Sequence, residues 1–138
     1  MFVLGFPLLL VPFAIYNIVA FLLRGFVWTD PVFQVRMISQ AEFSLSWGDL
    51  LVIVGLAFLF LEIVKATRMS RRSVVDHLLS LLLFIAMLVE FLLVPETATA
   101  TFFLLLAIVF VDVIAGFVVS LRTAQRDVSF ESVARGSE

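Results

Sequence analysis

The chain has 138 residues, of which 63% are hydrophobic and only 14% are charged, and its mean hydropathy is +1.20. Soluble domains of this length are about 45–50% apolar and about 25% charged, so this chain has too little polar surface to coat a water-soluble globule. A formal net charge of −2 gives no support for a nucleic-acid partner. The absence of cysteine excludes disulfides and cysteine-ligated metals. The composition predicts an integral membrane protein.

Four apolar segments are long enough to cross a bilayer as helices, which takes about 20 residues each. These segments cover residues 2–23, 48–66, 77–94 and 101–121. We therefore expect an all-α integral membrane protein in which residues 1–122 form a bundle of four transmembrane helices. Residues 123–138 are expected to form a tail that continues the last helix and then frays.

Basic residues are unevenly distributed among the connections, and this indicates the orientation. The loop expected at 65–76 and the chain from Arg122 onwards together carry seven of the nine Lys and Arg residues. The outer loop at 24–47 carries the other two, Arg24 and Arg36. Because cytoplasmic loops are enriched in Lys and Arg, we predict that the 65–76 loop, the tail and both termini are cytoplasmic. The membrane would be a plasma membrane, or the inner membrane of a bacterium.

Two stretches of the sequence resemble each other and carry an acid at the same place. The stretch 56–64 around Glu62 matches the stretch 106–114 around Asp112, fifty residues further on. A shorter similarity relates the ends of the first and third segments. We infer a duplicated helical hairpin, which is typical of parallel repeats about an axis along the membrane normal. Such a repeat places Glu62 and Asp112 at similar depth, where they would face one another.

The outer loop has a pattern of its own. Apolar residues alternate with polar ones on both sides of a short polar stretch: Phe33, Val35 and Met37, then Phe43, Leu45 and Trp47. This pattern predicts a short extracytoplasmic β-hairpin whose apolar face rests on the bundle or on lipid. The alternative is an interfacial segment anchored by Trp28 and Trp47. Ser46 and Asp49 have the spacing of a capping box, which predicts the start of the second helix.

The acids inside the apolar segments need partners. A charged side chain at the centre of a spanning helix costs about 2.5–3.5 kcal/mol in insertion experiments, and no basic residue lies one turn from Asp112 on its own helix. Asp112 therefore makes either an interhelical hydrogen bond that fixes packing or a proton, ion or ligand site, and both interpretations stay open. For Glu62, Lys65 lies three residues on and predicts an ion pair.

Three further polar residues join these as candidates. We expect Glu90 to reach Arg24 or water near the outer surface, and Asn17 to hydrogen-bond a neighbouring helix. His77, beside the basic loop, is interpreted as an interfacial hydrogen-bonding residue before a proton relay. The third segment places one stripe of residues on a single face: Asp76, Ser80, Leu83, Met87 and Glu90. The candidate site for proton or ion binding, or for helix packing, comprises Asp112, Glu62, Lys65, Glu90, His77 and Asn17.

The sequence contains no enzyme motif of the kinds expected for metallohydrolases, serine hydrolases or phosphate-binding loops. With one His and no Cys, a transition-metal site is disfavoured, and we expect neither metal nor cofactor. We therefore favour a structural or accessory subunit that packs in the lipid bilayer with a second copy or with other membrane proteins. The alternative is a proton- or cation-coupled transporter or channel subunit that uses Asp112 and Glu62, and a membrane enzyme is the weakest hypothesis.

Overall fold

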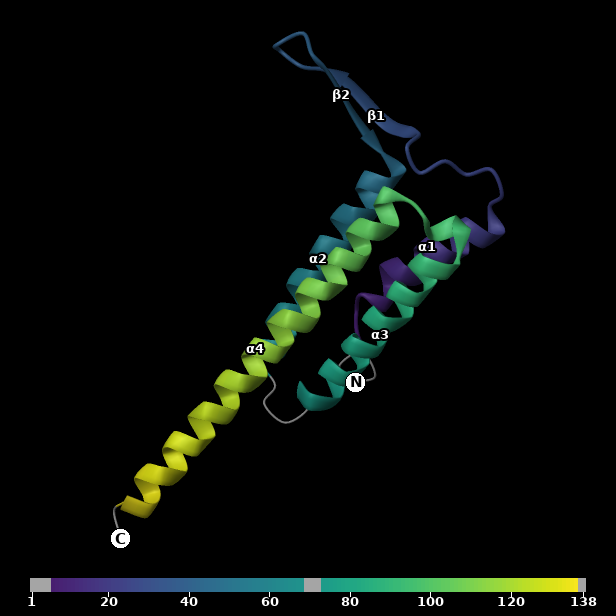
Figure 1. Ribbon diagram of the computed structural model, residues 1–138. Helices are drawn as coiled ribbons and strands as arrows, with labels where there is room; N and C mark the ends of the chain where they lie inside the picture. Colours follow the sequence, from purple (N-terminus) through teal and green to yellow (C-terminus); the bar gives the residue numbers. More distant parts are fainter. Residues whose placement is uncertain (1–5, 69–72, 137–138) are drawn as a thin grey trace.

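The computed structural model of the chain describes residues 6–68 and 73–136 and is mostly helical (Figure 1). In chain order the elements are α1 (Leu10–Leu22), β1 (Pro31–Arg36), β2 (Glu42–Ser46), α2 (Trp47–Arg68), α3 (Ser73–Leu93), the short 3-10 helix η2 (Pro95–Thr97) and α4 (Ala100–Gly136). Three of the helices, α2, α3 and α4, are long and apolar enough to cross a membrane. Together with the composition, they indicate a membrane-embedded protein.

The first helix is shorter than the segment predicted for it. Helix α1 has 13 residues, about 20 Å at 1.5 Å per residue, whereas the prediction covered residues 2–23. It is preceded by a turn in which the N–H of Leu10 donates to the carbonyl of Pro7 at 3.0 Å. Residues 2–5 of the predicted segment lie outside the described part of the chain. The described helix is therefore too short by itself to cross the hydrocarbon core of about 30 Å.

Helices α2 and α4 lie side by side in the same direction (Figure 1), and small residues on α2 bring them close. A Cβ atom at Gly48 would overlap the hydroxyl of Thr101, and one at Gly55 would lie 3.0 Å from Leu105. In each of these contacts the two residues are about fifty positions apart in the sequence, which is the offset of the sequence repeat. This packing register brings Glu62 of α2 level with Asp112 of α4.

Helix α3 returns antiparallel to α4 through η2, which forms a tight turn at Pro95–Thr97. The hydroxyl of Thr99 then accepts the N–H of Phe102 at 3.2 Å and caps the start of α4. Helix α4 runs for 37 residues and extends well beyond the other helices (Figure 1). The last predicted segment and the tail are thus one continuous helix as far as Gly136.

The β-hairpin predicted in the outer loop is present, with β1 and β2 antiparallel and Val35 opposite Phe43. The capping box is also confirmed, because Asp49 N–H donates to Ser46 Oγ at 3.1 Å and Ser46 N–H donates to Asp49 Oδ2 at 2.9 Å. The hairpin projects beyond the bundle (Figure 1), and Phe33 is 54% exposed. The apolar face of the hairpin does not rest on the bundle, because α2 begins directly after β2 and continues away from the hairpin. The other alternative, that this face rests on lipid, stays a prediction.

The bundle has two ends that matter for the site. At the hairpin end lie the end of α1, the β-hairpin, η2 and the start of α4; at the connection end, α2 leads to α3 (Figure 1). A buried apolar core runs between them, mostly along α3 and α4, and includes Tyr16, Met87, Phe102, Leu105 and Val109.

Candidate functional site

The six candidate residues separate into two groups at opposite ends of the bundle. Asp112, Glu62, Lys65 and His77 line one cavity at the connection end, where α2, α3 and α4 meet. Asn17 and Glu90 lie together at the hairpin end, where the Asn17 Nδ2 atom is 3.4 Å from Glu90 Oε2. The two groups form different kinds of environment.

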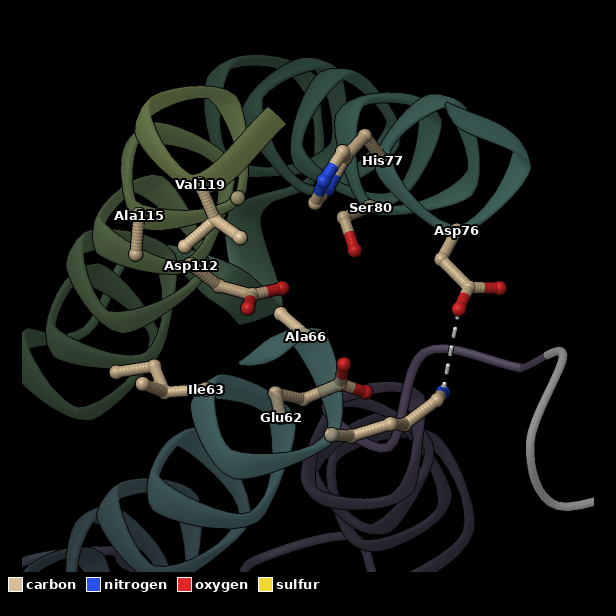
Figure 2. Close-up of a pocket in the computed structure, with 11 residues that line it drawn as sticks. Glu62, Ile63, Ala66, Asp76, His77, Ser80, Asp112, Ala115 and Val119 are labelled. Carbon is tan, nitrogen blue, oxygen red and sulfur yellow. Dashed lines mark ion pairs between the residues drawn. The ribbon is translucent and has the colours of Figure 1, made fainter. Parts of the chain in front are cut away.

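The cavity at the connection end, which we call the acid cavity, is small and polar (Figure 2). Its volume is about 20 Å³, room for about one water-sized species. Figure 2 shows the Glu62 and Asp112 carboxylates and the Ser80 hydroxyl directed towards this shared space. The titratable and hydroxyl side chains that line it are Glu62, Lys65, Asp76, His77, Ser80 and Asp112.

The hydrogen-bonding capacity of the buried Asp112 carboxyl group is only partly satisfied. Its residue is 7% exposed, and no described residue provides a hydrogen-bond partner for Oδ2. The Ser80 side chain is its hydrogen-bonding neighbour on α3, and the charges of His77 and Lys65 act on it from nearby. A buried polar atom without a partner is uncommon in folded proteins and calls for an explanation. The expectation that the partner of Asp112 comes from another helix is therefore met only in part.

Glu62 is 6% exposed and has a backbone partner instead of the predicted ion pair. The N–H of Leu8, in the turn ahead of α1, donates to the Glu62 carboxylate. A carboxylate in this place satisfies a free N–H at the start of a helix and interacts favourably with the helix dipole. Glu62 therefore ties the beginning of α1 to α2.

Lys65 turns away from Glu62 to two other partners. Its ammonium lies 3.9 Å from Asp76 Oδ2 and donates to the carbonyl of Phe6 at 3.0 Å. Within the described part of the chain, no ion pair joins Lys65 to Glu62. The predicted Glu62–Lys65 pair is thus replaced, because the long lysine stem carries the charge to the first turn of α3.

His77 occupies a close contact between α3 and α4. A Cβ atom at Gly116 would overlap the imidazole ring, so only glycine leaves room for it. The Nε2 atom of His77 is buried and has no hydrogen-bond partner in the residues that the structure describes. His77 lines the same cavity as Asp112, and its position at the membrane interface stays a prediction.

The polar group at the hairpin end, which we call the hairpin-end cluster, is well hydrogen-bonded. The hydroxyl of Tyr16 donates to the carbonyl of Glu96 at 2.9 Å and lies 2.7 Å from Thr99 Oγ1. The hydroxyl of Thr97 lies 2.9 Å from the carbonyl of Glu90. Asn17 Nδ2 donates to the carbonyl of Phe13, also on α1, at 3.1 Å, while Asn17 Oδ1 is without a partner among the described atoms.

Two residues of the hairpin-end cluster were not among the candidates predicted from the sequence. Tyr16 and Thr97 are both fully buried and join α1, η2 and the start of α4. The available signal for Tyr16 is that it is the single Tyr in a chain with 16 Phe residues. The predicted contact of Glu90 with Arg24 is not among the ion pairs of the described residues.

An apolar layer separates the acid cavity from the hairpin-end cluster. On α3, Leu83 and Met87 lie between Ser80 and Glu90 and are 6% and 0% exposed. On α4 the residues between Thr99 and Asp112 include five that are almost completely buried: Phe102, Leu105, Leu106, Ile108 and Val109. Of the stripe predicted on α3, Ser80, Leu83 and Met87 are buried in the core, and the two polar sites lie at opposite ends of the apolar layer.

In the described ranges, no three His, Asp or Glu side chains converge closely enough to hold a metal ion. Comparison with known protein families, with characterised proteins and with solved structures found no match for this chain. The candidate function is therefore argued from the acid cavity and its surroundings.

Proposed function

We propose that the chain crosses the membrane four times, with both termini and the connection end in the cytoplasm. Helices α2, α3 and α4 supply three crossings by length and composition. The first crossing combines α1 with the apolar residues ahead of it, from Phe6 to Leu9. The Lys and Arg residues at the end of α2, between α2 and α3, and in the last part of α4 support this orientation, because such residues favour the cytoplasmic side.

Within that topology, the chain acts as a subunit of a membrane assembly, formed with further copies or with other membrane proteins. The acid cavity is its working site and exchanges a proton or small cation with the cytoplasmic side. One observation carries this proposal: Asp112 is 7% exposed and lines the cavity, and its Oδ2 atom has no partner from the described residues. Buried acids in membrane segments mark ion pathways and proton relays more often than inert packing.

The need for an assembly follows from the apolar layer. Met87, Phe102 and Val109 fill the core between the acid cavity and the hairpin-end cluster. A proton or ion that reaches Asp112 from the connection end meets these side chains before it meets another polar group. A complete path through the membrane therefore requires surfaces from a second chain. The cavity itself has room for a water-sized species, which does not favour an enzyme acting on an organic substrate.

The test begins with the protein in its native membrane. The tagged chain is extracted in a mild detergent, its particle mass is measured, and the assembly is reconstituted into vesicles with a pH-sensitive or cation-sensitive dye inside. We expect a mass above the 15.5 kDa of one chain and a flux that Asp112→Asn abolishes while the particle mass stays the same.

Glu90→Gln is the matched control, because it neutralises an acid at the hairpin end. It should keep both the assembly and the flux. If the particle is a single chain, or if Asp112→Asn carries the same flux as the unchanged protein, the proposal is wrong. An assembly that forms but shows no flux in any variant would instead support a purely structural subunit.

A further inference from the structure

We infer that the Glu62–Asp112 pair is the proton-binding site of the acid cavity and holds one proton at neutral pH, and that uptake of a second proton by Glu62 is transmitted to the segment ahead of α1. This inference rests on the proposed function, because it names the species that the cavity exchanges. It also adds a structural response to that exchange.

The charges around the cavity favour a proton over a metal cation. On α3, Asp76 already has a counter-ion, because Lys65 of α2 lies 3.9 Å away. Glu62 and Asp112 remain, without an ion pair to any described basic residue. Two carboxylates that face each other in a medium of low polarity hold one proton between them more easily than they carry two charges.

The geometry of the ligands points the same way. No three metal-ligating side chains converge among the described residues, and the ammonium of Lys65 lines the same cavity, where it would repel a cation. A bound proton, in contrast to a metal ion, requires only one oxygen atom to carry it and one acceptor for its hydrogen bond. Asp112 Oδ2 has no partner from the described chain, and the groups that face it include Glu62 and Lys65 on α2 and Asp76, His77 and Ser80 on α3.

The response to the proton depends on the other contact of Glu62. Its carboxylate accepts the backbone N–H of Leu8, and Lys65 holds the carbonyl of Phe6, two residues earlier, at 3.0 Å. Hydrogen bonds to an ionised acceptor are roughly twice as strong as those between neutral groups. When the proton resides on Asp112, Glu62 is ionised and the Leu8 contact is strong. When Glu62 is also protonated, that contact weakens and the segment from Phe6 to Leu9 is released.

Hydrogen exchange of the Leu8 amide measures this response directly. The protection factor, corrected for the intrinsic pH dependence of exchange, is followed against pH in the native assembly. We expect protection to fall about tenfold as the pH is lowered through one midpoint, because a charge-assisted bond becomes a neutral one. The Leu10 amide, which donates to the carbonyl of Pro7, is the internal control and should stay constant.

Two variants and one addition make the test decisive. Glu62→Gln should remove the midpoint and hold Leu8 protection at the low value, about tenfold below that of the unchanged protein at neutral pH. Asp112→Asn should keep the midpoint near its value in the unchanged protein, because Asp112 is already neutral when Glu62 takes up its proton. Potassium or calcium chloride at millimolar concentration should change nothing in the unchanged protein beyond a matched salt control.

A Leu8 protection that is independent of pH and equal in Glu62→Gln would overturn the inference. Protection that changes with calcium or potassium in the unchanged protein, but not in Asp112→Asn, would assign a metal cation to the cavity instead. Either result leaves the flux of the assembly and its loss in Asp112→Asn standing, so the failure of this inference is distinct from the failure of the proposed function.

Discussion

The acid cavity and the hairpin-end cluster both bury polar side chains in an apolar bundle, but they satisfy them differently. At the hairpin end, the Tyr16 hydroxyl has a carbonyl and a hydroxyl as partners, and Thr97 bonds the carbonyl of Glu90. Asn17 Oδ1 is the exception there, without a partner among the described atoms. In the acid cavity, Asp112 Oδ2 and His77 Nε2 have no partners among the described atoms. Buried polar groups that are fully hydrogen-bonded rigidify a core, whereas unsatisfied ones weaken it. We therefore expect the hairpin-end cluster to stabilise the bundle and the acid cavity to exchange a proton.

The largest expected effect is at Tyr16. Tyr16→Ala should lower the free energy of unfolding by about 3–5 kcal/mol, because it removes a fully buried ring that stacks on Trp28 at 4.7 Å. Tyr16→Phe keeps the ring and should cost about 1–2 kcal/mol through its lost hydrogen bonds. Unfolding in detergent micelles with increasing dodecyl sulfate measures both. A Tyr16→Phe variant as stable as the unchanged protein would show that the cluster does not stabilise the bundle.

A smaller loss is expected at the contact of His77 with Gly116. Gly116→Ala places a Cβ atom where the imidazole lies and should cost about 1–3 kcal/mol, the usual range for overpacking. Combining it with His77→Ala should recover most of that loss, since the two sites are in contact. Gly136→Ala is the matched control because open space surrounds Gly136. Equal stability of the two glycine variants would contradict the described contact.

The smallest effect, with the opposite sign, is expected at Asp112. Asp112→Asn should leave the free energy of unfolding unchanged or raise it by up to about 1 kcal/mol, because an amide avoids the cost of a buried acid. The same unfolding titration measures it, with Glu90→Gln as the acid control from the hairpin end. A loss of about 3 kcal/mol or more would resemble the breaking of a buried ion pair and would make Asp112 a packing residue.

Much of the fold followed from local patterns in the sequence. The long apolar segments predicted α2, α3 and α4, and period-two alternation predicted the β-hairpin. The spacing of Ser46 and Asp49 predicted the start of α2. The repeat around Glu62 and Asp112 also predicted a relation in space, because α2 and α4 pack with the same spacing of about fifty residues. These features depend on residues close in sequence or on a single regular offset.

The contacts that could not be predicted join residues far apart in the chain. Tyr16 meets Thr99 across 83 residues, and Leu8 meets Glu62 across 54. Lys65 forms its ion pair with Asp76 on α3 and not with Glu62 on α2, the helix to which Lys65 itself belongs. The reach of the lysine side chain and the position of α3 decide which of the two nearby acids becomes its partner. Hydropathy indicates which helices lie in the membrane, but it does not indicate which polar groups meet there.

Infrared difference spectroscopy of the carboxylic-acid band tests most directly whether the acid cavity holds a proton. The difference spectrum is recorded on the reconstituted assembly between neutral and mildly alkaline pH. A carboxyl group that stays protonated in a buried site gives a C=O band distinct from ionised acids. We predict one such band at neutral pH that Asp112→Asn removes and Glu90→Gln leaves unchanged. A band that survives in Asp112→Asn, or that disappears in Glu90→Gln, would contradict the assignment of the proton site to the acid cavity.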